Sequence, residues 1–417
     1  MTSDERRCFS YFQHRTVPEI MGYFDSALWQ KLVFQVSQAE ESVYHAVVAL
    51  SAIHADYETR GRPLAKEDLD NPWHRFAIDQ CGRAFNQLST RSASQDPNLR
   101  EVTLVCCVLF VLAELMRGKY ELAFTHLQNG LQILRDTGCQ RSAYMAPGDT
   151  STLEQSLVDA FAHLDVQSAF FGLGGLVLPL KPVLRLTHNK VHVFTSLFEA
   201  RQVFDPLLGA CFQFHTTTAT KPREEILADY ENLSSWQFDL SSQLRHFAEA
   251  FIPWYANVSD QRSDKERRGA DIIYLHQLVL SMLLERGLLS RTEDVVDYYK
   301  PTFERILSMA ESIIASFADR PSVLVDMGVI PPLFFVSTEC PDPTVRWRAV
   351  RALHSWPHRE GPWDSKLIAK IAMETIAAEH GLSLNNGQDG LEAKNQDKPF
   401  RVCSAFTTIT EDQSEAV

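Results

Sequence analysis

Two pairs of side chains in this sequence could bind a metal or act as nucleophiles, and neither pair has the spacing that such chemistry needs. Cys106 and Cys107 are neighbours, but consecutive residues of a helix point about 100° apart, and free cysteine is commonly buried as a small hydrophobe. His45 and His54 lie far apart along one predicted helix, could share a metal only with a third element, and form no H-E-x-x-H motif. We therefore predict that all four are ordinary packing or polar residues.

The glycines and carboxylates give equally weak signals. Gly172, Gly174 and Gly175 match neither G-x-G-x-x-G nor a Walker pattern, and no strand precedes them, so they predict a turn. G-x-S-x-G is absent, and nothing marks a catalytic triad. Asp294 and Asp297 fall on a polar helix face, where carboxylates are solvated. The sequence thus predicts no catalytic residue, no cofactor-binding residue and no enzyme.

The eight cysteines predict reduced thiols rather than a zinc cluster. None forms a C-x-x-C pair, and most lie in apolar helical surroundings, which suits an intracellular protein. Cysteines scattered in this way are not expected to bring six thiolates onto two metal ions. We therefore predict no metal-binding residue and no zinc.

One predicted basic helix is a stronger candidate for a binding site than the residues above. The segment PTVRWRAVRALHSW carries Arg346, Arg348 and Arg351, with Trp347 among them and Arg359 beyond. Arg348 and Arg351 share a helix face, whereas Arg346 points roughly half a turn away from Arg348. Two interpretations stay open, namely a patch for an anion or a protein partner, and a solvated face paired to nearby acids.

The elements that carry these residues are predicted to be helices around a central hairpin. From Val102 to Ala113 almost every residue is apolar, which predicts a helix buried on all sides. Beyond Gly118 the apolar residues recur at helical spacing on one face only, which predicts an amphipathic helix that ends at Gly138 and folds back on the first. The predicted buried face of this second helix consists of Tyr120, Ala123, Phe124, Leu127, Leu131 and Leu134.

Caps and periodicity predict further helices. Capping-box spacing is found in Ser37 with Glu40 and in Ser151 with Glu154, while Asn71-Pro72 and Asp342-Pro343 are typical helix starts. The alternation typical of a strand is found at most over 400–409, so we expect no other strand. The further helices are predicted at about 37–58, 71–88, 151–171, 191–215, 222–256, 269–287, 292–317, 343–356 and 365–381. The expected fold class is all-α, a multi-helix array of packed helical hairpins.

The composition and the positions of glycine-rich, proline-rich and polar stretches indicate the class of protein and its domain organisation. The formal net charge of -13 over 417 residues argues against broad, nonspecific binding to nucleic acid. The polar N-terminus is no secretory signal, and no apolar run reaches membrane-spanning length. We predict one all-helical domain over 1–382, leave a subdivision near 172–190 open, and expect a mostly disordered polar tail over 383–417.

Three blocks resemble the regulatory region of fungal zinc-cluster transcription factors. Each block is short, but the three occur in the family's order and span roughly residues 5 to 380. The first block reads F-x-Y-F-x-x-x-T, F-D-x-x-x-W and H-A-V-x-A-L, carried by Phe9, Tyr11, Phe12, Thr16, Phe24, Asp25, Trp29, His45, Ala46, Val47, Ala49 and Leu50. The central block is carried by Gly118, Tyr120, Ala123, His126, Leu127, Gly130 and Leu131. The distal block is I-P-P-L-F-F-V (330–336), Asp342-Pro343 and the R-E-G-x-W-D residues Arg359, Glu360, Gly361, Trp363 and Asp364.

The resemblance implies an all-helical regulatory region that acts in the nucleus on metabolic or secondary-metabolite genes. It implies contacts with a protein partner or a second copy, allows a small-molecule effector, and involves no membrane. The family's reader of DNA is an N-terminal C-x2-C-x6-C cluster, and this spacing is absent here. We therefore expect this chain to contact DNA only indirectly, or through an N-terminal zinc cluster that this sequence does not contain. Whether such a cluster has been lost or is missing from the gene model stays open. The alternative is a helical ligand-binding or scaffold protein outside transcription.

Overall fold

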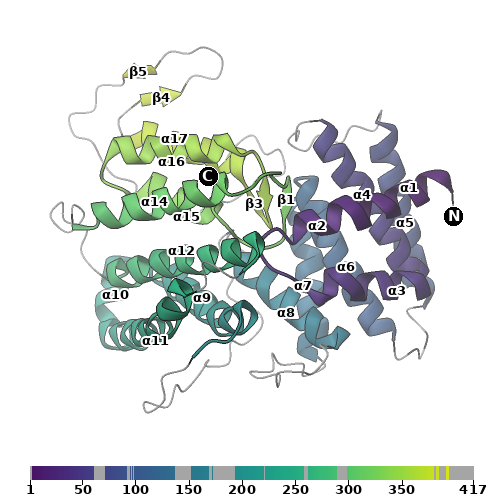
Figure 1. Ribbon diagram of the computed structural model, residues 1–417, viewed down its shortest axis with the longest axis horizontal. Helices are drawn as coiled ribbons and strands as arrows, with labels where there is room; N and C mark the ends of the chain where they lie inside the picture. The colour runs from purple at the N-terminus through teal and green to yellow at the C-terminus, as the bar shows by residue number, and fades with distance from the viewer. Residues whose placement is uncertain are drawn as a thin grey trace. The chain divides into compact units, whose positions relative to one another are not determined.

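The computed structural model of the protein confirms the all-α fold class (Figure 1). It describes residues 2–60, 71–91, 98–136, 152–168, 193–219, 221–257, 262–288, 298–379, 382–384 and 391–393, with positions 94, 96 and 171. The chain divides into two compact units. Unit 1 is Met1–Lys181 with Pro321–Asp326 and Thr408–Val417, and unit 2 is Pro182–Arg320 with Met327–Thr407. The domain of 1–382, its subdivision near 172–190 and the disordered tail stay predictions.

Unit 1 is built from helices of the N-terminal part of the chain and one short strand from much further along. Its helices are α1 (Ser3–Tyr11), the π-helical turn η1 (Phe12–Thr16), α2 (Val17–Ile20), the π-helical turn η2 (Leu28–Leu32), α3 (Val33–Ala39), α4 (Glu41–Thr59), α5 (Pro72–Arg91), α6 (Leu99–Met116), α7 (Tyr120–Asp136) and α8 (Leu153–Ser168). The strand is β1 (Val323–Leu324).

Unit 2 contains the remaining helices and two small antiparallel hairpins. Its helices are α9 (Leu197–Ala219), α10 (Arg223–Ala228), α11 (Tyr230–Ala256), α12 (Asp264–Arg286), α14 (Lys300–Ala315), α15 (Ile330–Glu339), α16 (Pro343–Ser355) and α17 (Ser365–Glu379). The hairpins pair β2 (Arg359–Glu360) with β3 (Trp363–Asp364), and β4 (Leu382–Leu384) with β5 (Leu391–Ala393). Periodicity misses strands of two or three residues, because they are too short to show alternation.

The predicted central hairpin is confirmed. Every residue of α6 from Leu104 to Met116 is buried, while α7 buries only the predicted face and Gly130. Gly118 turns the chain between them with a φ of 70°, a conformation that glycine adopts without strain. Gly130 is required by packing rather than by its backbone, because a Cβ there would lie 2.1 Å from the ring of Phe161.

Two of the four predicted helix starts are confirmed. Asn71 accepts a hydrogen bond from the N–H of Trp73 at 2.9 Å at the start of α5. Asp342 accepts from the N–H of Thr344 at 2.8 Å at the start of α16. Both side chains satisfy a helix donor that would otherwise have no partner.

The capping box at Ser37 is wrong, although the helix after it is real. α3 runs through Ser37, so its hydroxyl donates to the carbonyl O of Phe34 at 2.8 Å. α4 begins at Glu41 without a side-chain cap. The other box involves Ser151, which lies outside the described residues. The N–H of Gln155 in α8 donates at 3.2 Å to Thr152 instead.

Several other predictions also fall outside the described part of the chain. These are the stop at Gly138, the glycines 172, 174 and 175, the carboxylates 294 and 297, the cysteines 139 and 403, and the strand over 400–409. The cysteines that the structure describes are free thiols. Burial raises the pKa of Cys106 to about 12 and that of Cys107 to about 11, as expected for packing residues. Among the described helices none is long and apolar enough to cross a membrane.

The contrast between α6 and α7 predicts unequal effects of two alanine substitutions. Leu109 is 1% exposed, so Leu109→Ala should open a cavity and cost about 2–5 kcal/mol of unfolding free energy. Gln128 lies on the exposed face of α7, so Gln128→Ala should cost less than about 0.5 kcal/mol. Thermal melts of the two variants measure the difference. Equal destabilisation would mean that Gln128 has a buried hydrogen-bond partner.

Candidate functional site

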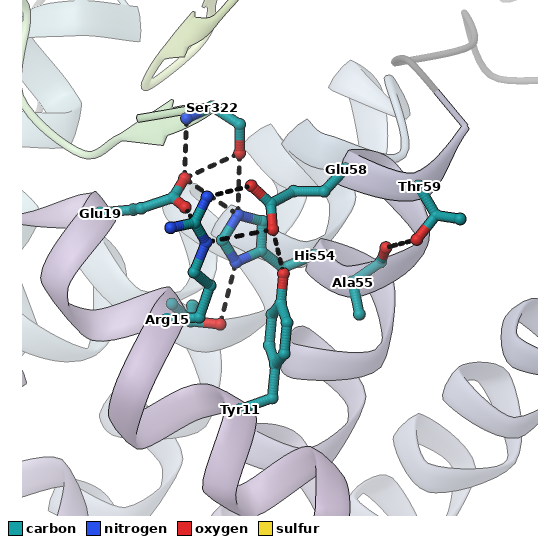
Figure 2. A network of polar contacts seen from close by, with 9 residues as sticks. Tyr11, Arg15, Glu19, His54, Ala55, Glu58, Thr59 and Ser322 are labelled. Atoms are coloured by element: carbon teal, nitrogen blue, oxygen red, sulfur yellow. Dashed lines mark hydrogen bonds and ion pairs between the residues drawn. The ribbon is translucent and has the colours of Figure 1, made fainter. Parts of the chain in front are cut away.

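A network of polar side chains lies where α1, η1 and α2 pack against α4 (Figure 2). The turn η1 leads directly into α2, and this path brings Tyr11, Arg15 and Glu19 to face His54 and Glu58 of α4. Widened turns of the η1 kind occur mostly as single turns and often at functional sites.

His54 is the centre of this network and has no exposed surface. Its Nδ1 lies 2.9 Å from Thr16 Oγ1, and its Nε2 lies 2.9 Å from Ser322 Oγ and 3.4 Å from Glu19 Oε2. Glu19 Oε2 also accepts the N–H of Ser322 at 2.7 Å and its hydroxyl at 2.9 Å. Both ring nitrogens of the buried imidazole are thus satisfied, as buried polar atoms require.

Ser322 belongs to a segment, residues 321–326, that we call the strap. The strap is part of unit 1 although it follows α14 in the chain. The N–H of Val325 donates to the carbonyl O of Ile20, and its own carbonyl O accepts from the side chain of Gln167, both at 3.0 Å. At the end of the strap, Asp326 pairs with His163 at 3.1 Å. Polar contacts therefore fix the strap along its length.

Gly22 lets the strap approach the end of α2. A Cβ at Gly22 would lie 2.6 Å from Leu324 Cδ2, and Leu324 has no exposed surface. Leu324 of the strap therefore packs in the core of unit 1, while Ser322 of the strap joins the polar network. This contact joins residues some three hundred positions apart, which sequence spacing alone does not reveal.

Glu19 is held as a carboxylate inside this network. Burial opposes its ionisation, but the hydrogen bond and charge of His54 and the two donors of Ser322 outweigh that cost. The pKa of Glu19 therefore lies well below its ordinary value of 4.5. Arg15 adds an ion pair, since its Nε lies 2.7 Å from Glu19 Oε1. Glu58 accepts from Arg15 and Tyr11 nearer the surface.

Glu19, His54 and Glu58 have the donor types of a metal site, and their ligand atoms lie within 4.8 Å of one another. The guanidinium of Arg15 contacts both carboxylates, however, and so already supplies a positive charge between them. A metal ion would have to displace Arg15 and take His54 from its hydroxyl partners. His45 is no further ligand here, because its Nδ1 lies 2.7 Å from Gln80 Oε1.

We therefore keep the prediction that the protein binds no zinc. Metal analysis of the purified protein after dialysis should find essentially none, because Arg15 balances the charge of the two carboxylates. Arg15→Ala removes that charge and is the informative companion variant, since it should bind a divalent cation better than the wild type. Two tightly bound zinc ions in the wild type would overturn our interpretation of the cysteines.

A second buried network lies in unit 2, where the R-E-G-x-W-D block meets the I-P-P-L block. Glu360 has no exposed surface and accepts the N–H groups of Gly328, Val329 and Ile330, each at 2.9 Å. These donors lie at the N-terminus of α15, whose helix dipole favours a carboxylate. Burial opposes the ionisation of Glu360, but His358 and these donors outweigh it, so its pKa is lowered.

The two prolines of I-P-P-L explain why one carboxylate suffices at this helix end. Pro331 and Pro332 have no N–H to satisfy, and the N–H of Leu333 already donates to the carbonyl O of Val329 at 3.0 Å. Glu360 therefore pairs the donors that remain at the start of α15. The two parts of the distal block are structural partners in this unit.

His358 and Arg359 complete the second network. The Nδ1 of His358 lies 2.7 Å from the carbonyl O of Trp356, and its Nε2 lies 2.9 Å from Glu360 Oε1. Both neighbours accept hydrogen bonds, so the ring donates from both nitrogens and balances the charge of Glu360. Arg359 pairs with Asp364 at 3.1 Å, and Asp364 caps α17 by accepting the N–H of Leu367. Both networks thus fix helices in place.

The structure does not bring the three arginines of the predicted patch to one surface. Arg346 is 3% exposed, donates to the carbonyl O of Ser337 at 2.6 Å and pairs with Glu379. Its inclusion in a surface patch is wrong, because α16 packs this face into the core. Arg348 pairs with Glu311 of α14, and Arg351 is exposed. A contact of Arg348 and Arg351 with an anion or a protein partner stays a prediction.

Sequence reasoning missed both buried networks. Glu360 stands among polar residues in the sequence and resembles a solvated carboxylate, whereas Glu19 stands between apolar residues of the first block and gives no spacing signal. The predicted packing or polar role of His54 fits its burial, but its partners come from two separate segments, residues 16–19 and the strap. The signal that could have found Glu360 is the I-P-P start of α15, since a buried helix N-terminus needs an acceptor.

Comparison with known proteins confirms the resemblance to fungal regulators. Residues 7–211 match the family described as "Fungal specific transcription factor domain". This match covers α2 to α8 completely, whereas the distal block lies beyond it and remains a resemblance. No solved structure matches the chain.

Two curated proteins are among its relatives. "Transcription regulator lscL" of Purpureocillium lilacinum is 26% identical over 129 residues, which are 30% of this chain and 30% of that protein. "Aspercryptin biosynthesis cluster-specific transcription regulator atnN" of Emericella nidulans is 21% identical over 465 residues, covering 90% of this chain and 73% of that protein. The match thus spans under a third of the first relative's length. The family and these names together support a transcription regulator.

Proposed function

We propose, from the match of residues 7–211 to the fungal-specific transcription factor domain, that this chain regulates transcription in the nucleus. The match begins within α1, includes all later helices of unit 1 and runs on into α9 of unit 2, and this coverage of unit 1 is the observation that carries the proposal. The described helices of unit 1 form a closed core whose buried polar groups fix helices. Its role is then regulatory rather than catalytic, and it acts through contacts with other proteins.

We further propose that its targets are genes of a metabolic or secondary-metabolite cluster. The support is the name of the Emericella nidulans relative, which is specific to the aspercryptin biosynthesis cluster and aligns over 90% of this chain. Contact with the promoter would come through a partner's DNA-binding module or through a zinc cluster encoded outside this sequence. A small-molecule effector is compatible with either route.

A tethering experiment tests the proposal. The full chain is fused to a heterologous DNA-binding domain and placed before a reporter gene in a filamentous fungus, and a fluorescent fusion is followed in parallel. We expect the fusion to enter the nucleus and to change reporter output in either direction. Leu109→Ala is a folding-deficient control, which should lose the effect together with its melting temperature. Exclusion from the nucleus with no change in reporter output would refute the proposal.

The chain by itself is expected to bind no DNA specifically. With a formal net charge of -13 it offers few favourable phosphate contacts. A mobility-shift assay with cluster promoters at about 0.15 M salt should show no complex that survives competitor DNA. A sequence-specific shift by the purified chain would contradict this prediction, while the tethering result would still stand.

The alternative function is a helical ligand-binding or scaffold protein outside transcription. The observation that favours it is the buried character of both polar networks, which any helical scaffold could use. Cell localisation separates the two functions, because a scaffold of this kind has no need to enter the nucleus. The genomic sequence just upstream of Met1 adds a further test. An in-frame C-x2-C-x6-C segment there would favour direct contact with DNA.

A further inference from the structure

Three large apolar side chains project into solvent from α10 and α11 of unit 2. Leu227 is 63% exposed, Tyr230 is 51% exposed and Phe238 is 69% exposed. Leu227 lies three residues before Tyr230, where α10 leads into α11. Tyr230 and Phe238 are eight residues apart, so their side chains leave α11 within about 80° of each other. We call Leu227, Tyr230 and Phe238 the α10–α11 face.

The fold of unit 2 does not use this face. α11 packs on α9 and α12 through other residues, among them Leu233, Leu240 and Leu244, which are 2–4% exposed. Leu240 follows Phe238 by two residues and so lies about 160° away from it around the helix. Phe238 therefore points away from the side of α11 that packs into its own unit.

Small side chains surround Phe238 on the helix surface. The positions three and four residues before it and after it are its nearest neighbours there. All four of them are serine, namely Ser234, Ser235, Ser241 and Ser242. Serine is too short to cover a phenyl ring, so the ring stands alone with space on every side. A large side chain among small ones suits the packing of another helix around it, as knobs pack into holes.

The α10–α11 face is bordered by carboxylates without a cationic partner. Four of them are exposed, namely Glu224, Glu225, Glu231 and Asp239. No ion pair joins any of these four to a described side chain, whereas the exposed acids Asp79, Asp264 and Glu374 pair within their own helices. The helix dipole accounts for acids in the first turns of α10 and α11, but not for Asp239 in the third turn of α11.

The sequence around the face carries charge of one sign. From residue 224 to residue 244 it contains five acidic residues and no lysine or arginine. A surface of this kind attracts a basic partner and repels an acidic one or a nucleic acid. A helix with one apolar stripe and lysines or arginines beside it complements both the exposed side chains and the carboxylates.

We propose that the α10–α11 face binds a basic amphipathic helix of another protein. The apolar stripe of that helix packs on Leu227, Tyr230 and Phe238, and its basic side chains pair with Glu231 and Asp239. The inference rests on the proposed function, because it names the chemistry of the partner through which the regulator acts. DNA-binding modules are rich in lysine and arginine, since they neutralise phosphates, so a partner's module of this kind offers such a helix.

Fluorescence anisotropy with two synthetic peptides tests the inference. The first is a helical peptide of about 14 residues, about 21 Å long, with leucines three and four positions apart and lysines elsewhere. The second has glutamate in place of every lysine. The full chain should bind the lysine peptide at least tenfold more tightly than the glutamate peptide at about 0.05 M salt, and less tightly at about 0.3 M.

Phe238→Ser should weaken binding of the lysine peptide about tenfold, because it removes the largest apolar contact. Its melting temperature should not fall, since the ring is 69% exposed and packs on nothing in its own unit. Phe198→Ser is the matched control, because it makes the same change on α9 at a side chain that is 63% exposed. That variant should bind the peptide like the wild type.

A charge reversal separates the face from the overall charge of -13. The double variant Glu231→Lys with Asp239→Lys should lose the lysine peptide and prefer the glutamate peptide. Glu121→Lys with Glu374→Lys makes the same change of net charge at exposed sites outside the face, and should keep the wild-type preference. Both variants are checked by thermal melts, so that a loss of binding is not ascribed to unfolding.

The inference is overturned if the wild type binds neither peptide, or prefers the glutamate peptide. It is also overturned if Phe238→Ser and Phe198→Ser weaken binding equally, or if the two charge variants behave alike. Binding of the lysine peptide that disappears as the chain associates with itself would show that a second copy covers the face instead. The tethered fusion in the reporter test carries its own DNA-binding domain, so an active reporter without peptide binding would refute this inference alone.

Discussion

Glu360→Ala is expected to lower the free energy of unfolding by about 3–5 kcal/mol, the usual cost of removing one partner of a buried charge pair. The substitution leaves three backbone N–H groups at the start of α15 without an acceptor. It also leaves His358 with an unbalanced buried charge. Both penalties arise in a site with no exposed surface, so water cannot replace the carboxylate without rearrangement.

Urea unfolding followed by circular dichroism measures this effect, with Glu374→Ala as the matched control. Glu374 also sits in unit 2, on α17, but its side chain is 44% exposed and pairs only loosely with Lys370 at 3.7 Å. That variant should change the unfolding free energy by less than about 0.5 kcal/mol. If the two variants unfold at the same urea concentration, Glu360 is not the acceptor that holds α15.

Glu19→Ala is expected to have a comparable effect on unit 1, again about 3–5 kcal/mol. Its loss leaves His54 and the N–H of Ser322 without their buried acceptor and frees the strap at its first residues. Ser322→Ala should cost less, about 1–3 kcal/mol, because the backbone N–H still reaches Glu19 after the hydroxyl is gone. The order of the two effects is therefore part of the prediction.

Thermal melts and limited proteolysis check this order. Glu121→Ala on α7 is the control, since Glu121 is exposed and should be near neutral. Protease sites within or next to the strap should be cut faster in Glu19→Ala than in the control. A strap that is cut no faster, in a protein that melts like the control, would show that the network does not hold these residues.

The same carboxylate predicts how stability depends on pH. The pKa of Glu19 is lowered on folding, so its contribution is complete above the ordinary value of 4.5 and is lost as the pH falls below it toward the folded value. Glu360 shifts in the same direction and adds to the loss. Wild-type stability should therefore decline below about pH 4.5, and Glu19→Gln should decline less steeply. Parallel pH profiles would contradict the lowered pKa.

Local sequence patterns predicted most of the helices correctly. The unbroken apolar run of α6 and the one-sided pattern of α7 identified a buried helix and its amphipathic neighbour, because burial of a helix face is written in residues three and four apart. Asn71-Pro72 and Asp342-Pro343 marked helix starts for the same local reason. The predicted capping box at Ser37 is wrong because spacing alone cannot distinguish a helix cap from a serine inside the preceding helix.

The helical class, the central hairpin and the resemblance to fungal regulators could all be predicted from residue patterns within short stretches of the sequence. The buried polar networks, in contrast, depend on how the chain packs in three dimensions. Glu19 meets Ser322 and His54 across separate segments, and Glu360 meets the first residues of α15, because packing rather than spacing brings these atoms together. Arg346 shows the reverse case, since a residue that looks like part of a basic surface is buried against Glu379. Hydrogen bonds and charges act over a few ångströms in space, and distance along the chain does not record which groups come that close.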